Sequence, residues 1–285
     1  MNGILATRHF CKQASGGILS PSKEPPRAPF DGSAELAEVK LRVLATAKNT
    51  PHSETVRWLD AQIHFDSPRP SVIMVGMSAL AFVLSRHNLN SVAALTGALE
   101  VDPRTSGLAL HYLWQDERLV GRLRSLASNS GRLVVALSFA TANLPDIALL
   151  LPEIRSMAAP YVVVGGPHPS ARPAEVLHLG VDAVVVGEGE EALPALLERV
   201  LDGESPAGLP GVVTLAADGS VLPGPRPRPV DLNAFPPVGV AHRRFGPIEI
   251  TRGCPSACAF CQTSFLFGGR MRHRSVEHVT TWVQR

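Results

Sequence analysis

Two stretches in the middle of the chain decide the fold: Val162-Val-Val-Gly-Gly-Pro-His-Pro169 and Gly180-Val-Asp-Ala-Val-Val-Val-Gly-Glu-Gly-Glu-Glu191. In each, a short apolar run ends in a glycine-rich turn. Short runs of Val and Ala are typical of strands that are buried on both faces of a parallel sheet. We therefore predict strands over Tyr161–Val164 and Ala183–Val186, each followed by a loop at the same edge of the sheet.

The same alternation extends toward the amino terminus. Three further apolar runs are Val72–Val75, Leu108–Leu113 and Leu133–Leu137. After the fifth run, apolar residues repeat at helical spacing at positions 193, 196, 197, 200 and 201. Strands that alternate with helices predict an α/β fold, here a doubly wound, Rossmann-like five-stranded parallel sheet over residues 71–202.

Such sheets bind ligands beyond the carboxyl ends of their strands. Three distinctive loops follow the third, fourth and fifth predicted strands, and glycine lets the backbone approach a flat ligand closely. The candidate binding residues in these loops are Ser138, Phe139, Thr141, Gly165, Gly166, His168, Gly187, Glu188 and Gly189. The alternative is that the loops are only tight turns, with Glu190 and Glu191 favourable to a helix amino terminus. No G-x-G-x-x-G follows the first strand and no G-x-x-x-x-G-K-[ST] occurs, so NAD and ATP lose their main support.

Three cysteines lie close together near the carboxyl end, in Thr251-Arg-Gly-Cys-Pro-Ser-Ala-Cys-Ala-Phe-Cys261. The spacing C-x3-C-x2-C lets one short loop, after a strand predicted over 245–252, turn Cys254, Cys258 and Cys261 toward a common point. A four-iron cluster can take three thiolates and keep one iron open, whereas structural zinc needs four closed ligands. We predict a cluster. A zinc site formed by the three cysteines and His242, His273 or His278 remains an alternative.

The cysteine run resembles the signature of the radical S-adenosylmethionine (SAM) superfamily, which has this spacing and an aromatic residue, here Phe260, before the third cysteine. The resemblance implies a [4Fe-4S] cluster on the three cysteines, and it places Phe260 among the cofactor-binding residues. It also implies that the open iron chelates SAM, which an electron from the cluster cleaves to a 5′-deoxyadenosyl radical. Residues 245–285 would be the first part of a radical SAM (β/α) partial barrel, ending in a helix over 276–283.

The sheet region, residues 71–202, resembles the cobalamin-binding domain that precedes many radical SAM domains. The resemblance is carried by the two stretches quoted first. No D-x-H-x-x-G run occurs, so the resemblance implies a corrinoid with its nucleotide tail buried in the sheet edge and no protein histidine on cobalt. His168 would then be a polar wall or a structural hydrogen-bonding residue.

The remaining segments complete the expected organisation. Residues 1–35, rich in Ser, Gly and Pro, predict a disordered leader, and residues 36–70 a helical extension. Residues 203–244 predict a linker with a hairpin, Val212–Leu215 and Val221–Leu222, around an Asp-Gly turn. A radical SAM barrel needs several more strand-helix units, so we expect the sequence to be a fragment of a longer protein.

The composition and net charge of the chain limit the classes of partner that it can bind. The 285 residues are 45% apolar, which is enough for a sizeable core, and the formal charge of +2 implies no polyanionic partner such as a nucleic acid. Six arginines near the carboxyl end could meet RNA, a cofactor carboxylate or only solvent, and we favour solvated surface: Arg243, Arg244, Arg252, Arg270, Arg272 and Arg274. Four cysteines do not support a disulfide framework, and the longest apolar run is too short to cross a membrane. We expect a cytoplasmic protein without a membrane partner.

The function expected from both resemblances is that of a cobalamin-dependent radical SAM enzyme, with methyl transfer to an unactivated carbon as the family's commonest chemistry. It would need a small-molecule substrate and an electron donor such as flavodoxin or ferredoxin. The catalytic residues stay unassigned, and the fragment alone should turn over little. Two alternatives remain: a non-catalytic corrinoid carrier with a structural metal on the cysteine loop, and a radical SAM enzyme that modifies RNA.

Overall fold

The computed structural model describes residues 77–157, 160–256 and 258–285. The predicted leader (1–35), the predicted helical extension (36–70) and the predicted first strand Val72–Val75 lie outside the described residues. Among the described residues, no helix is both long and apolar enough to cross a membrane.

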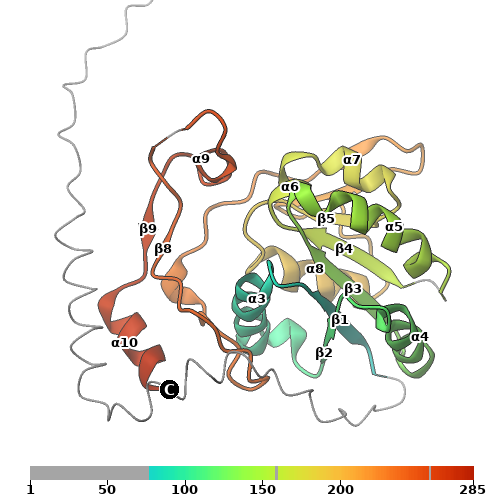
Figure 1. Cartoon of the computed structure of the whole chain (residues 1–285), viewed down its shortest axis with the longest axis horizontal. Coiled ribbons are helices and arrows are strands. Elements are labelled where there is room, and N and C mark those ends of the chain that lie inside the picture. Colours follow the sequence, from blue (N-terminus) through green and yellow to red (C-terminus); the bar gives the residue numbers. More distant parts are fainter. Residues whose placement is uncertain (1–76, 158–159, 257) are drawn as a thin grey trace, which may run out of the picture. The chain divides into compact units, whose positions relative to one another are not determined.

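A parallel sheet forms the centre of the fold (Figure 1). Five parallel strands are present, as predicted in number, in the spatial order β2-β1-β3-β4-β5, and four of them lie at the predicted runs. The first strand lies just after the run that we predicted, and all six of its residues are buried. The strands are β1 Ala79–Leu84, β2 Ala109–Trp114, β3 Leu133–Ser138, β4 Tyr161–Gly165 and β5 Ala183–Val185.

The predicted hairpin is also present, but it is part of the sheet. Its strands β6 (Val212–Leu215) and β7 (Val221–Pro223) add to the edge at β5 in antiparallel pairing, giving a sheet of seven strands. The Asp-Gly turn forms as expected, with Gly219 at a φ of 80° and the Asp218 side chain accepting from the Ser220 amide at 2.9 Å. The first part of the segment predicted as a linker therefore continues the sheet.

Helices cover both faces of the sheet because alternate strand residues are apolar on each side. One core joins the sheet to α4 (Leu119–Asn129), α5 (Leu144–Arg155) and α7 (Pro173–His178). The other core joins the opposite face to α3 (Leu89–Val101) and α8 (Ala192–Leu201). The shorter elements are α6 (Pro167–Ala171) and three 3₁₀ turns, η1 (Pro103–Thr105), η2 (Thr141–Asn143) and η3 (Leu232–Ala234).

The strand order places a crevice at one point of the sheet edge. The chain steps from β1 outward to β2 and then returns past β1 to β3, so the connections leave in opposite directions at the boundary between β1 and β3. Open α/β sheets bind ligands at such a switch point, beyond the carboxyl ends of the strands. The fold therefore predicts a site beside the ends of β1 and β3.

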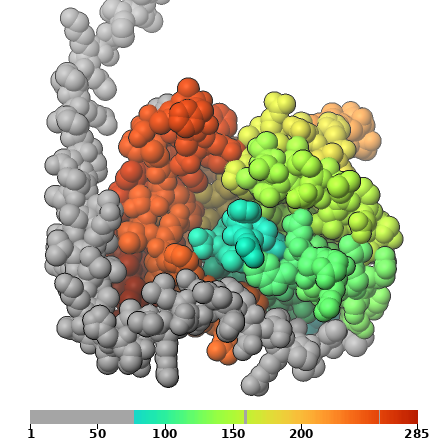
Figure 2. All heavy atoms as spheres, in the orientation of Figure 1, coloured from blue at the N-terminus to red at the C-terminus, as the bar shows by residue number. Residues whose placement is uncertain are grey.

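The carboxyl-terminal segment, residues 245–285, lies beside α3 and α6 (Figures 1 and 2). The strand predicted over 245–252 is shorter in the structure: β8 is Thr251–Arg252, and it pairs antiparallel with β9, Arg272–His273. Gly246 and Pro247 precede it, and proline cannot donate to a ladder. The helix α9 spans Gln262–Leu266, and the predicted last helix is confirmed as α10, Val276–Gln284.

Candidate functional site at the sheet edge and the cysteine loop

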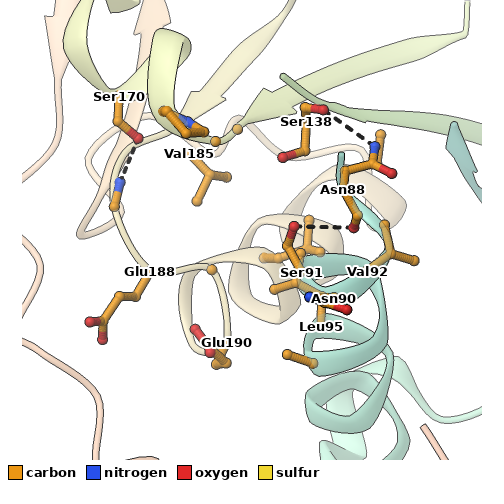
Figure 3. Close-up of a pocket in the computed structure, with 18 of the residues that line it drawn as sticks. Asn88, Asn90, Ser91, Val92, Leu95, Ser138, Ser170, Val185, Glu188 and Glu190 are labelled. Carbon is orange, nitrogen blue, oxygen red and sulfur yellow. Dashed lines mark hydrogen bonds between the residues drawn. The ribbon is translucent and has the colours of Figure 1, made fainter. Parts of the chain in front are cut away.

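A cavity of about 510 Å³ lies at the carboxyl edge of the sheet (Figure 3). This volume is in the range of small-molecule sites. Three parts of the chain line it: the ends of β1, β3, β4 and β5 with the loops that follow, the first turns of α3, and the segment around the cysteine loop. The deep wall is apolar, with Phe82, Val163 and Val185, and the rim is polar. The cavity therefore suits a ligand with an apolar part and hydrogen-bonding groups.

The wall beside β1 depends on Asn88, a buried residue that the sequence reasoning missed. Its side-chain oxygen accepts from the Ser85 amide at 2.9 Å, and its amide donates to the carbonyls of Val83 at 2.9 Å and Ser138 at 3.3 Å. Asn88 thus joins the end of β1 to the end of β3, and the hydroxyl of Ser91 donates back to its carbonyl at 3.1 Å (Figure 3). The sequence signal for Asn88 was the polar run 85–88, which directly follows the apolar run. It was missed because the first strand was predicted at 72–75.

The opposite wall consists of the two glycine-rich loops. Gly166 has a φ of 94°, and a β-carbon there would lie 2.6 Å from the Ser138 hydroxyl, so a side chain does not fit. Gly187, with a φ of 81°, donates its amide to the Ser170 hydroxyl at 2.9 Å (Figure 3). Six of the predicted binding residues line the cavity: Ser138, Gly165, Gly166, Gly187, Glu188 and Gly189.

The other predicted loop residues lie behind this wall. His168 is 4% exposed, its ring stacks on Phe139 with centroids 5.7 Å apart, and its Nδ1 is 3.1 Å from the Thr141 hydroxyl. Its amide donates to the Phe139 carbonyl at 3.2 Å. None of the three residues lines the cavity, so their contacts support the loops after β3 and β4 from behind.

The cysteine loop lies next to the cavity without lining it. Cys254 and Cys261 are partly exposed, Cys258 is exposed, and Phe260 is 93% exposed, whereas Gln262 and Thr263 line the cavity. Hydrogen bonds from Ser256 lower the pKa of the Cys254 thiol, and those from Thr263 lower that of Cys261. Both effects favour the thiolates that a metal requires. In the described part of the chain, no three His, Cys, Asp or Glu side chains converge as a metal site.

The three histidines that could complete a zinc site each contact another residue. His242 Nδ1 lies 2.9 Å from Glu100 Oε1, and His273 Nδ1 lies 2.9 Å from the Thr251 hydroxyl. His278 Nε2 accepts from the Arg274 guanidinium at 3.0 Å. The zinc alternative therefore gains no support from the positions of these side chains.

A cluster of charges joins the cavity to the base of the cysteine loop. Arg252 pairs with Glu190 at 2.6 Å and Glu249 at 2.7 Å, and lies 3.7 Å from Glu188. Arg272 pairs with Glu188 as well. Burial opposes the charge on Arg252, but the hydrogen bond to Glu249 and the charge of Glu190 outweigh it and raise its pKa.

The expectation that the late arginines are solvated is wrong for Arg252, Arg272 and Arg274, and the guanidinium of Arg244 lies over the Tyr112 ring, 3.8 Å from its centroid. The side chains of Arg252 and Arg272 are 10% and 22% exposed. Arg274 is 2% exposed, and it donates to the carbonyls of Glu249, Leu232 and Phe235. Charge counting along the sequence could not show this, because the partners lie in three separate segments.

The residue types at the cavity and in the cysteine loop suit the two groups that the resemblances imply. Glycines at 165, 166, 187 and 189 line the cavity with backbone alone, and Ser138 lines it beside them. A cavity of about 510 Å³ is in the range that holds a small-molecule group such as the nucleotide tail of a corrinoid. Cysteines with favoured thiolates on one short loop are the donor set of an iron-sulfur cluster.

Comparison with known proteins agrees with this geometry. Residues 115–197 match the family model described as B12 binding domain. An uncharacterized methyltransferase from Pyrococcus horikoshii is 34% identical over 133 residues, which cover 42% of this chain and 28% of that protein. The hopanoid C-3 methylase of Methylococcus capsulatus is 30% identical over 160 residues, covering 50% of this chain and 30% of that protein.

The fold also resembles a solved structure, that of the radical S-adenosylmethionine methyltransferase TsrM from Kitasatospora setae with cobalamin and a [4Fe-4S] cluster bound. The TM-score is 0.56 at 19% identity, with 74% of this chain and 45% of TsrM covered. The chain thus spans less than a third of the curated relatives it matches and under half of TsrM. The predicted resemblance to cobalamin-binding domains is confirmed by the family model, and the likeness to TsrM confirms the Rossmann-like α/β fold.

Proposed function

We propose that this chain provides the cobalamin-binding region and the cluster loop of a radical SAM enzyme that transfers a methyl group to an unactivated carbon. One observation carries the proposal: a single cavity is walled on one side by the glycine-rich loops of a B12-binding type of sheet and on the other by residues that directly follow the cysteine loop. The names of the relatives, a methyltransferase and a methylase, support the reaction type.

The residues divide into two groups. Ser138, Gly165, Gly166, Gly187 and Gly189 would hold the corrinoid tail, with the apolar strand residues beneath them keeping water away from it. Cys254, Cys258 and Cys261 would hold the [4Fe-4S] cluster. When bound, the corrinoid supplies the methyl group, and the cluster together with SAM supplies the radical that activates the substrate carbon.

The proposal implies further components. A small molecule is the substrate, and a one-electron donor such as flavodoxin or ferredoxin reduces the cluster. Oxygen-sensitive thiolates favour the reducing cytoplasm as the place of action.

A substitution that fills the cavity tests the corrinoid site. A β-carbon at Gly165 would lie 3.5 Å from the Val185 carbonyl, an ordinary contact, so Gly165→Leu is tolerated there. Because Gly165 lines the cavity, the added side chain should occupy part of it. The matched control is Gly121→Leu on the exposed face of α4, where a β-carbon meets nothing within 4 Å. Absorbance titration with hydroxocobalamin should give a dissociation constant raised at least about tenfold by Gly165→Leu, a change of about 1.4 kcal/mol. Equal affinities for both variants would contradict the site.

Removal of one cysteine tests the cluster. After anaerobic reconstitution with iron and sulfide, the unaltered chain should show the absorbance and, when reduced, the electron paramagnetic resonance signal of a four-iron cluster. Cys258→Ala should lose both while its affinity for hydroxocobalamin stays within about twofold, because Cys258 does not line the cavity. Zinc instead of iron in the unaltered protein would overturn the radical mechanism.

A further inference from the structure

Arg252 occupies a position that connects two parts of the proposed site. It ends β8 and lies two residues before Cys254, the first of the cluster cysteines. Its side chain is 10% exposed, and it donates three hydrogen bonds to Glu249 and one to Glu190. A guanidinium that is bound at several atoms has a fixed orientation, unlike a single charge on a flexible chain. The backbone that leads into the cysteine loop is therefore held in place by this side chain.

The acidic partners on the other side belong to the cavity. Glu188 and Glu190 lie in the loop after β5, and both line the cavity. Glu188 turns away from the α3 side of the cavity (Figure 3), accepts from the Val230 amide at 2.8 Å and pairs with Arg272. The carboxylates are 8% and 6% exposed, so solvent screens the pairs little. A shift of the loop after β5 would therefore move the two carboxylates to which Arg252, at the base of the cysteine loop, is bound.

A second connection lies on the far side of the cysteines. The side-chain amide of Gln262, directly after Cys261, donates to the carbonyl of Pro167, which belongs to the glycine-rich turn after β4. The cysteine loop is thus held before its first cysteine by Arg252 and after its last by Gln262. Both attachments end on loops that line the cavity.

We propose that Arg252, through Glu188 and Glu190, is a positioning residue that fixes the cysteine loop against the cavity and so couples occupation of the cavity to order in the loop. The identity of the ligand that fills the cavity rests on the proposed function, whereas the anchoring of the loop is independent of it. A ligand that holds the glycine-rich loops in place favours the ordered cysteine loop, and by linkage the ordered loop favours the ligand. Two cofactors that must react across a fixed gap need such rigidity.

The test measures the reactivity of the loop thiols. The cluster-free chain is alkylated with iodoacetamide under reducing, anaerobic conditions, and mass spectrometry of the digested protein follows the peptide that holds Cys254, Cys258 and Cys261, separately from Cys11. The variants are Arg252→Met, Arg252→Lys and Glu190→Gln. Each is measured without ligand and with saturating hydroxocobalamin, whose binding is followed by absorbance.

Arg155→Met is the matched control for a purely structural arginine. Arg155 also pairs with a carboxylate, Asp182 at 2.7 Å, and donates to the carbonyls of Gly180 at 2.6 Å and Pro160 at 2.9 Å. These partners lie at the amino ends of β4 and β5, the edge opposite the cavity. Its loss weakens the fold without touching the cysteine loop.

Without ligand, we expect Arg252→Met to speed alkylation of the loop peptide at least about fivefold, Arg252→Lys and Glu190→Gln by less, and Arg155→Met by under about twofold. Hydroxocobalamin should slow alkylation in the unaltered chain and in Arg155→Met but not in Arg252→Met. Equal rates for Arg252→Met and Arg155→Met would overturn the anchoring. If hydroxocobalamin slowed alkylation in Arg252→Met as much as in the unaltered chain, the ligand would shield the thiols directly, and the coupling would be overturned. No corrinoid uptake by the unaltered chain would instead refute the proposed function, and the coupling with it, while the rates without ligand still decide the anchoring.

Discussion

The sheet and the carboxyl-terminal segment are held together by different forces. Two apolar cores, one on each face, surround the strands, and most strand residues are buried. In the described part of residues 245–285, Val279 is the one buried apolar side chain, and Arg274 is the buried polar one. Apolar burial is non-directional and sums over many contacts, whereas the segment depends on a few charge-assisted hydrogen bonds.

The two regions should therefore respond differently to the loss of one contact. The sheet should unfold as a unit, because removing one contact leaves many others. The segment should open locally, since elements with few buried apolar contacts occupy the low-stability end of a structure. The cysteine loop thus lies in the less stable region, and the arginines attach it to the more stable sheet.

The largest effect is expected in the sheet. Leu196 is fully buried between α8 and the strands, and Leu196→Ala should lower the free energy of unfolding by about 2–5 kcal/mol, because it removes apolar contacts and leaves a cavity. Urea denaturation followed by circular dichroism measures this. Leu149→Ala, at an exposed leucine on α5, is the control. A loss below about 1 kcal/mol would show that apolar burial does not dominate the stability of the sheet.

A smaller and local effect is expected for Arg274→Met. The carbonyls of Leu232, Phe235 and Glu249 lose a charged donor, so the free energy of opening β9 and α10 should fall by about 2 kcal/mol. Hydrogen exchange of these elements should be roughly 30 times faster, while exchange in β3 and β4 stays unchanged. Arg270→Met, at an exposed arginine of the same segment, should change neither. Faster exchange throughout the sheet would show that the two regions open together.

The smallest effect concerns pH. Burial and the charge of Arg274 lower the pKa of His278, and its Nε2 accepts from Arg274, so protonation breaks this bond. The open segment therefore binds the proton more readily than the closed one. The contribution of His278 is fully present above its ordinary pKa, about 6.5, and is lost as pH falls below that value.

Hydrogen exchange of α10, corrected for the intrinsic pH dependence, should thus show less protection at pH 5.5 than at pH 7.5. His278→Gln should remove most of that difference, whereas His178→Gln, at an exposed histidine of α7, should leave it intact. A pH dependence that persists in His278→Gln would assign it to another group.

Much of the fold could be predicted because each parallel strand carries its signal locally. The runs that ended at Leu113, Leu137, Val164 and Val186 were placed within about a residue of the observed strands, and the glycine-rich turns after them lie at the cavity as expected. The strand β1 was not predicted, because the apolar run from Val72 to Leu84 is interrupted by Gly76 and Ser78 and only its first part was taken as a strand; the polar residues that follow Leu84 were the better guide.

The site was predicted less completely. Ser138, Gly166 and Gly187 could be found because a strand end followed by glycine marks a sheet edge, but Asn88 and Ser170 act through hydrogen bonds between separate loops. The role of Arg252 was hidden for the same reason: Glu190 is 62 residues away in the sequence.

The parallel sheet, the edge at which its loops gather and the cysteine spacing could all be inferred from the order of the amino acids, because each depends on the residue types within one short stretch. That the cysteine segment borders the same cavity, and that buried arginines hold it there, became apparent from the folded chain. An ion pair is defined by the distance between two side chains, and the folded backbone sets that distance.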